Sequence, residues 1–320
     1  MAAAIALGER GRGRTAPNPN VGCMIVKHGR VVGRGWTQPG GRPHAEAMAL
    51  DAAGDAARGA DVFVTLEPCA HASPRGLACA DRLAAAAPAR VVAAISDPDP
   101  RTDGKGLARL RAACIAVGTG LLEAEARRSM AGFLQRQALG RPFVTLKLAT
   151  SLDGRIALAD GRSRWITGAA ARAHAHLERA RHEAILVGGA TLRIDAPALD
   201  VRLDGLAARS PRRLVLTRGA APDGWEAVGD PAAVDGLAGI DHLLVEGGAG
   251  AAAAFLRSGR VDRLLLYRAP ILIGGGRAAL GDLGLTALAD AHGCWTLTDA
   301  RMLGSDRVEV YEAAPCSPAL

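Results

Sequence analysis

Aromatic residues and lysines are both scarce in this sequence. Phe, Trp and Tyr make up only 3% of its 320 residues, and only three of its 39 basic residues are lysines. A surface that stacks nucleic-acid bases needs aromatic side chains among its basic ones, and residues 1–140 contain only Trp36, Phe63 and Phe133 of this class. The scarcity weighs against nucleic-acid binding, while the excess of arginine and alanine is typical of codon bias.

Long hydrophobic runs are absent as well. No stretch of about 18 apolar residues is free of charge, which argues against a membrane span. Arg10, Arg12 and Arg14 follow very few apolar residues, so the start of the chain does not resemble a signal peptide. With 49% hydrophobic and 22% charged residues, the chain has enough apolar surface to fold. We expect a cytoplasmic globular protein, and the length favours two domains at about 150 residues each.

Six cysteines are too few for a disulfide scaffold in a chain of this length. In a reducing compartment, cysteines serve more often as core residues or metal ligands. Cys23, Cys114 and Cys294 lie in apolar contexts and are predicted to be small buried side chains. Cys69 and Cys79 are instead candidates for metal ligands.

Strand and helix patterns alternate along the first half of the chain. Strands are predicted at 21–26, 62–66 and 91–95, and helices at 45–57, 80–87, 107–113 and 121–139. Such alternation is typical of an α/β fold with a largely parallel sheet covered by helices. The sequence Gly140-Arg141-Pro142 then breaks the pattern. We therefore predict a first domain at 1–142 and a second at 143–320.

The second half repeats this alternation and predicts another α/β unit. Its strands are expected at 143–148, 184–187, 214–217, 243–246, 264–267 and 308–311, and a helix is expected at 169–180. Charge separates the two halves: residues 1–143 hold 19 basic and 12 acidic residues, whereas residues 144–320 hold 20 of each. The net charge of +7 thus belongs to the first half, where it is compatible with an acidic substrate, nucleic acid or plain solvated surface.

A candidate zinc site lies in the first half. His44 precedes a predicted helix, Cys69 follows a predicted strand, and Cys79 comes ten residues later. One imidazole and two thiolates are a ligand set of catalytic zinc, which lowers the pKa of a bound water to about 7. Glu46 stands where zinc deaminases carry their general acid/base in the pattern H-x-E…P-C-x-x-C. The nine residues between the cysteines depart from that pattern, and His71 within them could complete a structural four-ligand site.

Motifs along nearly the whole chain resemble the bifunctional riboflavin-biosynthesis deaminase–reductase family. In the first half these are 17–23 (PNPNVGC), 44–46 (HAE), 65–69 (TLEPC) and 97–98 (DP). In the second half they are 147–148 (KL), 151–154 (SLDG), 163–167 (SRWIT), 191–195 (TLRID) and 246–248 (EGG). The resemblance implies a cytidine-deaminase-like α/β/α domain followed by a dihydrofolate-reductase-like α/β domain. It also implies Zn²⁺ and NADPH as cofactors, and a homodimer or larger assembly.

The implied deaminase substrate is a 2,5-diamino-6-ribosylaminopyrimidinone 5′-phosphate, which loses its 2-amino group as ammonia. Glu46 would move the protons, and Asn20 would hydrogen-bond the pyrimidine; the alternative is that Asn20 is a turn residue. His71 and Arg75 would contact the phosphate or the ribose. Asp99 stands where the family commonly has Asn, so a hydrogen-bond donor to the substrate ring would be missing if that position contacts it.

The second half would use NADPH to reduce the ribosyl chain to a ribityl chain. Gly248, Ala249 and Gly250 follow a predicted strand and open a helix, so their N–H groups could cradle a phosphate. The other cofactor contacts that the resemblance implies are Ala149, Trp165, Thr191, Asp195 and Thr217. The implied substrate contacts are Ser163, Arg179, Leu199, Arg202 and Glu246. Without the resemblance, the two arginines could be ordinary solvated side chains.

Lys147 falls inside an apolar strand, where a charged side chain needs a partner or solvent. Two other functions remain open at this point. A nucleic-acid base deaminase with an accessory domain would use the basic first half as a binding face. A non-enzymatic zinc-stabilised binding module would function without Glu46.

Overall fold

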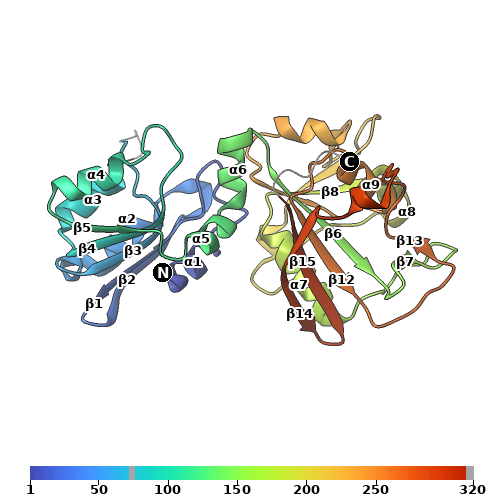
Figure 1. Ribbon diagram of the computed structural model, residues 1–320, viewed down its shortest axis with the longest axis horizontal. Coiled ribbons are helices and arrows are strands. Elements are labelled where there is room, and N and C mark those ends of the chain that lie inside the picture. Colours follow the sequence, from blue (N-terminus) through green and yellow to red (C-terminus); the bar gives the residue numbers. More distant parts are fainter. Residues whose placement is uncertain (72–75, 315–320) are drawn as a thin grey trace. The chain divides into compact units, whose positions relative to one another are not determined.

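The chain forms two compact units, which a computed structural model describes for residues 1–71 and 76–314 (Figure 1). One unit is Met1–Gly140 and the other is Arg141–Leu320. This division falls two residues before the boundary expected from the sequence. Within the described residues, no helix has the length and apolar character needed to cross a membrane.

The first unit is built on a five-stranded sheet in the order β2-β1-β3-β4-β5. Its strands are β1 (Gly22–Lys27), β2 (Arg30–Trp36), β3 (Asp61–Leu66), β4 (Arg90–Ile95) and β5 (Ala116–Thr119). Strands β3, β4 and β5 run parallel, while β1 is antiparallel to both β2 and β3. His28 and Gly29 close the β1–β2 hairpin with positive φ angles of 49° and 75°, as a two-residue turn between twisted strands requires. The prediction of a largely parallel sheet therefore holds for three of the five strands.

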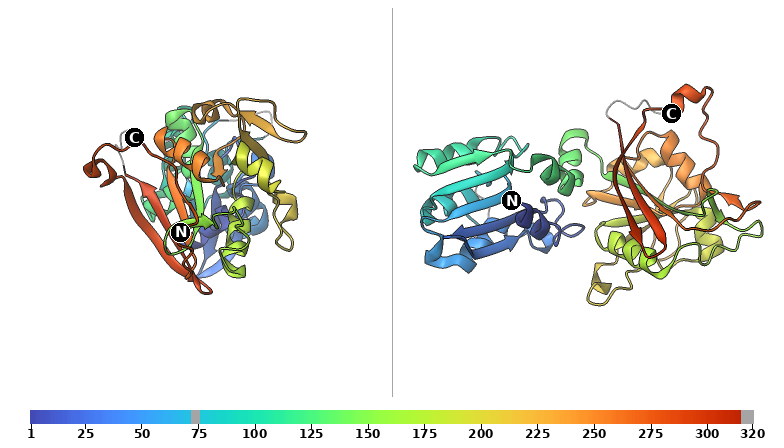
Figure 2. Two further views of the ribbon diagram at one scale, coloured as in Figure 1. Left: turned by 90° about the vertical axis from the view of Figure 1, so that its right-hand side faces the viewer. Right: turned by 60° about the horizontal axis from the view of Figure 1, so that its bottom comes forward.

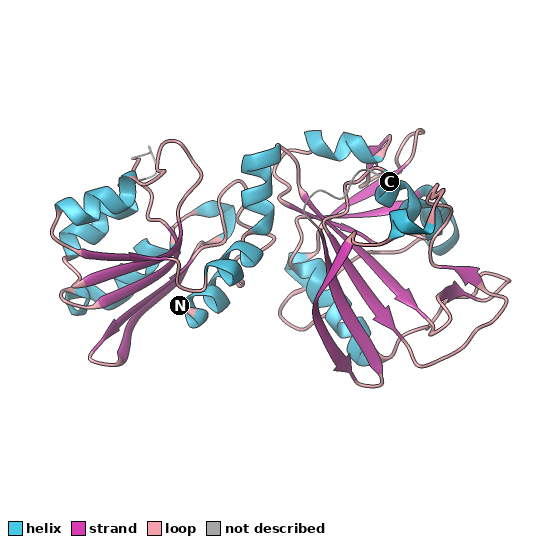
Figure 3. Ribbon diagram, viewed as in Figure 1, coloured by secondary structure: helices cyan, strands magenta, loops and turns pink. Residues whose placement is uncertain are grey.

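Helices cover both faces of this sheet (Figure 3). The helices are α1 (Ala2–Gly8), α2 (Ala45–Ala53), α3 (Cys79–Ala86), α4 (Lys105–Ala112), α5 (Glu123–Ser129) and α6 (Ala131–Leu139). Neighbouring residues on a strand face opposite sides of a sheet. Gly22 lies against α1, because a Cβ atom added there would clash with the main chain of that helix. The next residue, Cys23, pairs with Gly35 on β2, and Gly35 lies against α2. Helices α1 and α2 thus lie on opposite faces, and the unit has three layers.

The second unit is built on an eight-stranded sheet in the order β10-β9-β8-β11-β6-β12-β15-β14. Its strands are β6 (Phe143–Thr150), β8 (Ala184–Gly188), β9 (Arg212–Leu216), β10 (Glu226–Val228), β11 (His242–Val245), β12 (Arg263–Arg268), β14 (Trp295–Leu303) and β15 (Asp306–Ala313). The six strands from β10 to β12 are parallel, and β15 and β14 add an antiparallel hairpin. Figure 2 shows this hairpin, coloured red, as two long strands side by side. A separate two-stranded ribbon joins β7 (Arg155–Ala157) to β13 (Arg277–Ala278).

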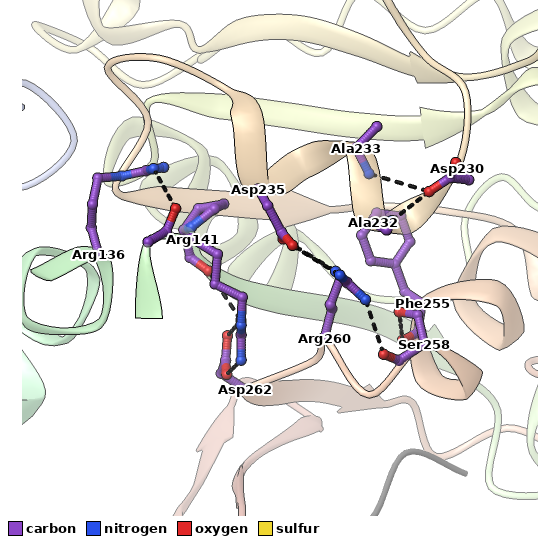
Figure 4. Close-up of polar contacts among 12 residues, drawn as sticks. Arg136, Arg141, Asp230, Ala232, Ala233, Asp235, Phe255, Ser258, Arg260 and Asp262 are labelled. Carbon is purple, nitrogen blue, oxygen red and sulfur yellow. Dashed lines mark hydrogen bonds and ion pairs between the residues drawn. The ribbon is translucent and has the colours of Figure 1, made fainter. Parts of the chain in front are cut away.

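The α-helices in the described part of this unit are α7 (Ala169–Ala180), α8 (Gly189–Asp195) and α9 (Ala249–Arg257). The entry into β6 is fixed by a bidentate ion pair, because Arg141 donates to both carboxylate oxygens of Asp262 at 2.9 and 2.8 Å (Figure 4). Asp262 also accepts a hydrogen bond from the main-chain N–H of Val144 at 2.8 Å. These contacts set the start of the strand that carries Lys147 and Ala149.

Two local predictions were wrong. The helical stretch expected at 121–139 is two helices, α5 and α6, that meet at Met130 with φ −105° and ψ 20°. Cys23 is buried as expected, but Cys114 is exposed and Cys294 is partly exposed. Cys114 lies just after α4 with φ 59°, so an apolar sequence context did not place it in the core.

Candidate functional sites

The zinc-ligand candidates meet where three elements of the first unit end or begin. His44 directly precedes α2, Cys69 follows β3, and Cys79 is the first residue of α3. The Nδ1 atom of His44 lies 3.3 Å from the Sγ of Cys79 and 3.7 Å from the Sγ of Cys69. One potential ligand atom from each residue lies within 4.8 Å of the others. The nine residues that separate the two cysteines therefore do not prevent them from meeting.

The local electrostatics favour a thiolate at this point. The main-chain N–H of Cys79 donates to the Sγ of Cys69 at 3.3 Å, and the N–H of Ala80 donates to the Cys69 carbonyl at 3.1 Å. Hydrogen bonding from Cys79 lowers the pKa of Cys69 to about 4, and His44 contributes in the same direction. Helix N-termini stabilise negative charge, and thiolates are the form that binds zinc. Three protein ligands and a neighbouring pocket are the arrangement of a catalytic zinc site.

Glu46 lies in the first turn of α2, two residues beyond His44, and its side chain is 4% exposed. Burial raises the pKa of Glu46 to about 7, against the opposing effect of the His44 charge. A carboxyl with a pKa near neutrality can both accept and deliver a proton at physiological pH. Its place beside the ligand cluster thus suits proton transfer.

A pocket of about 340 Å³ opens onto this cluster. Its lining residues are Arg42, Pro43, His44, Ala47, Gly76, Leu77, Cys79 and Arg82. Sequence reasoning missed the two arginines. Arg82 is three residues after Cys79 on α3, so it shares a helix face with that cysteine, and Arg42 is two residues before His44. Both spacings can be read from the sequence, but neither arginine belongs to a motif that carries the family resemblance.

The other deaminase candidates have separate surroundings. The buried Asn20 donates from Nδ2 to the Ser129 carbonyl at 3.2 Å, so its amide nitrogen is already engaged. His71 lies 3.4 Å from the hydroxyl of Thr102 through its Nδ1 atom. Asp99 is paired with Arg101 at 2.5 Å, which offsets the charge that distinguishes it from Asn. Arg75 lies outside the described residues.

The candidate cofactor residues of the second unit gather at the carboxyl edge of its parallel strands. Ala149 lies near the end of β6, Thr217 follows β9, Thr191 lies on the helix after β8, and Gly248 follows β11. Ligands of open α/β sheets bind at this edge. Thr191 and Gly248 are in direct contact, because the Gly248 N–H donates to the Thr191 hydroxyl at 3.2 Å. Ala249 and Gly250 begin α9 directly beyond Gly248.

A largely buried ion cluster lies at the same edge. Arg179 donates to both carboxylate oxygens of Glu246, at 2.8 and 2.9 Å, and the Nζ of Lys147 lies 3.7 Å from Glu246. The partner that Lys147 was expected to need is therefore Glu246. Burial alone would raise the pKa of Glu246, but Lys147 and Arg179 outweigh it and hold that pKa at about 2.

The remaining reductase candidates have varied surroundings. Trp165 is 63% exposed, and the Arg172 guanidinium lies 4.7 Å from its ring centroid. Arg202 is exposed and lies 3.5 Å from Asp200. Leu199 is buried, Ser163 is half-buried, and Asp195 is exposed at the end of α8. Arg179 donates to the main-chain carbonyl of Asp200 at 3.1 Å, which places the 199–202 segment beside the ion cluster.

Comparison with known proteins gives a family match for each half of the chain. Residues 1–95 match the cytidine and deoxycytidylate deaminase zinc-binding region, and residues 142–228 and 232–307 match the RibD C-terminal domain. The riboflavin biosynthesis protein RibD of Escherichia coli (strain K12) is 41% identical over 340 residues, covering 91% of this chain and 92% of that protein. RibD of Mycobacterium tuberculosis (strain H37Rv) is 41% identical over 311 residues, covering 92% and 91%.

Two solved structures share the fold over nearly the full length. Acinetobacter baumannii RibD (form 1) is 35% identical with a TM-score of 0.84, covering 98% of both chains. The Thermotoga maritima diaminohydroxyphosphoribosylaminopyrimidine deaminase/5-amino-6-(5-phosphoribosylamino)uracil reductase is 29% identical with a TM-score of 0.87, covering 98% of this chain and 97% of that one.

The fold and the two sites define a zinc-binding deaminase domain followed by a reductase domain. The deaminase part is cytidine-deaminase-like and the reductase part is dihydrofolate-reductase-like. The chain belongs to the RibD family of bifunctional deaminase–reductases of riboflavin biosynthesis. The family, the fold class and the two enzyme activities predicted from the motifs are thereby confirmed, with zinc and a nicotinamide as the cofactors that the two domains imply.

Proposed function

We propose that the 1–142 domain deaminates a 2,5-diamino-6-ribosylaminopyrimidinone 5′-phosphate, with zinc held by His44, Cys69 and Cys79. The observation that carries this proposal is the ligand cluster, whose three atoms lie within 4.8 Å beside a pocket of about 340 Å³. A pocket of this size suits a small molecule. When bound, zinc would supply an activated water for hydrolysis. Glu46 would accept the proton of that water and deliver a proton to the leaving amine.

We further propose that Arg42 and Arg82 attract the substrate phosphate, because guanidinium groups are suited to phosphate oxygens. Arg42→Ala is expected to raise the KM of deamination about tenfold, which is the loss of roughly one charged hydrogen bond, with a smaller change in kcat. Steady-state kinetics at two salt concentrations test this, because added salt screens charges and should reduce the difference in KM between the wild type and Arg42→Ala. The exposed Arg30 on β2 supplies the control, and an equal effect of Arg30→Ala would contradict a local role for Arg42.

For the 143–320 domain we propose NADPH-dependent reduction of 5-amino-6-(5-phosphoribosylamino)uracil to its ribitylamino product. The cofactor phosphates would lie at the start of α9, near Gly248, Ala249 and Gly250, where main-chain N–H groups point toward an anion. Ala149, Trp165, Asp195 and Thr217 would line the rest of the cofactor site. Ser163, Arg179, Leu199, Arg202 and Glu246 would contact the substrate. Hydride transfer is the chemistry of the cofactor, so this site needs binding and orientation rather than a nucleophile.

The Thr191–Gly248 contact gives a sharp test of the cofactor site. Thr191→Val removes the hydroxyl that accepts from the Gly248 N–H, so the loop loses the bond that orients it. We expect the Kd for NADPH to rise about threefold to tenfold, the value of one ordinary hydrogen bond. Thr191→Ser keeps the hydroxyl and should bind as the wild type does. Fluorescence titrations with NADPH measure this effect, and parallel titrations with NADH measure the proposed preference for NADPH. Equal binding of NADPH by the Val and Ser variants would argue against phosphate binding by the loop at Gly248.

A direct assay tests the two reactions together. Purified zinc-replete protein is given the diaminopyrimidine phosphate with and without NADPH, and ammonia release and NADPH oxidation are followed. We expect ammonia in both cases and oxidation only after deamination; no turnover of either kind would overturn the proposal.

We also propose a homo-oligomer, to be tested by sedimentation. We propose a cytoplasmic location, because thiols are kept reduced in that compartment and so remain available as metal ligands.

A further inference from the structure

Glu67 is a buried carboxylate that neither proposed reaction uses. It lies two residues before Cys69, and its side chain is 2% exposed. Its oxygens accept three main-chain hydrogen bonds from segments far along the chain. Oε2 accepts from Asp97 at 3.3 Å and from Gly104 at 3.0 Å, and Oε1 accepts from Leu107 at 3.1 Å. The strand end that carries Cys69 is therefore tied to the region between β4 and α4.

These bonds give α4 its N-terminal cap. Helix N-termini leave N–H groups without partners, and a side chain of the capping residue usually accepts from them. The residue before α4 is Gly104, which has no side chain to do so. Glu67 supplies the acceptor instead from another segment, with a negative charge that the helix dipole favours. The position of Glu67 and the position of α4 are thus coupled.

The first turn of α4 also touches the main chain next to Cys69. A Cβ atom on Gly106 would lie 2.0 Å from the carbonyl oxygen of Pro68, so only glycine permits this approach. On the other side of Cys69, the N–H of Ala70 donates to the hydroxyl of Thr102 at 3.4 Å. The residues on either side of Cys69 therefore both contact the 97–107 segment.

We propose that Glu67 is the positioning residue of the zinc centre, holding Cys69 at its place relative to His44 and Cys79 through α4. This rests on the proposed zinc site. Groups that hold a metal ligand from outside tune both metal affinity and geometry. Pro68 has a fixed φ and no N–H, which removes one of the backbone torsions that could absorb a shift of Glu67 before it reaches Cys69.

Glu67→Gln tests this assignment in the full-length protein. The amide keeps the shape but replaces one acceptor oxygen by an NH₂ group, which cannot accept from the surrounding N–H donors. We expect zinc affinity to fall about tenfold, measured by competition with a chelator. The thiolate-to-metal absorption of the Co²⁺-substituted protein should shift. NADPH-dependent reduction, which uses the other unit, should be unchanged.

Two further variants separate positioning from stability. Leu110→Ala removes a fully buried side chain of α4 but leaves the three main-chain donors to Glu67 in place, because these belong to other residues. It should therefore lower the unfolding temperature yet leave zinc affinity and the Co²⁺ spectrum as in the wild type. Gly106→Ala favours the helix but displaces Pro68, so it should reproduce the spectral change of Glu67→Gln. Wild-type affinity and spectra in both Glu67→Gln and Gly106→Ala would overturn the positioning role alone. A wild-type protein that holds no zinc would overturn the zinc site itself.

Discussion

Glu46→Gln is expected to slow ammonia release by about 10²–10⁴-fold, the range typical of a lost general acid/base. The amide fills the same buried space but cannot accept and return a proton. Because Glu46 is not one of the three ligand candidates, the variant should keep its zinc, as metal analysis can verify. Reduction of the deaminated substrate should proceed at the wild-type rate, since that reaction is assigned to the other unit.

Glu125→Gln makes the same chemical change at an exposed position of α5 in the same unit. It should leave both activities intact. A Glu46→Gln enzyme that still released ammonia at near the wild-type rate, with zinc bound, would remove Glu46 from the reaction. Equal losses of deamination and reduction would instead contradict the assignment of the two activities to separate units.

The zinc cluster could be predicted from the sequence because each ligand sits at an element boundary that the chain itself marks. His44 precedes a run of helix-forming residues, and Pro68-Cys69 ends a β-branched strand. Boundaries of this kind fix where a side chain lies along its own element. They do not fix what else lies nearby, so Arg42 and Arg82 appeared as pocket residues only in three dimensions.

Strand order explains why the ion-pair partner of Lys147 could not be predicted from the sequence. The need of Lys147 for a partner follows from its apolar strand, but the identity of the partner does not. Glu246 is almost a hundred residues away, and it reaches Lys147 only because β11 inserts beside β6 in the sheet. Such adjacency depends on the packing of the whole sheet, which local patterns do not encode.

Exposed elements were the hardest to predict. Strand β14 (Trp295–Leu303) is exposed over most of its length, so it lacks the alternation of buried and exposed residues that marks a strand. Helix α8 has no buried residue, and its sequence gives no apolar face to detect. Both were absent from the predicted elements, whereas the fully buried strand β11 was expected at nearly its observed place.

The net charge of +7 can be related to the two candidate sites. The first unit, Met1–Gly140, holds 18 basic and 12 acidic residues and so carries +6 of this charge, and it places two arginines at the zinc pocket. In the second unit, Arg179 and Lys147 share the carboxylate of Glu246, and Arg179 also lies near the charge of Asp200. Basic side chains thus stand at both proposed sites, although most of the net charge belongs to the first unit.

Glu246→Gln is expected to act on the reductase alone and to destabilise its unit. The lowered pKa of about 2, against an ordinary 4.5, means that the charged form of Glu246 stabilises the fold. The corresponding free energy is about 3 kcal/mol, close to the typical cost of breaking a buried ion pair. This stabilisation is present above pH 4.5 and is lost as the pH falls through the folded-state pKa of about 2. The difference in unfolding free energy between wild type and variant should therefore shrink from pH 6 to pH 3.

The reductase kcat/KM of Glu246→Gln should fall about 10- to 100-fold, because Arg179 loses the charged bonds that orient it, while ammonia release stays unchanged. Glu226→Gln is the matched control, since Glu226 pairs with Arg212 through two bonds of 3.0 and 2.7 Å at an exposed position. Exposed pairs contribute little, so that variant should match the wild type in stability and turnover. A Glu246→Gln protein that is destabilised but reduces substrate normally, measured where it is fully folded, would show that the carboxylate supports the fold and not the reaction.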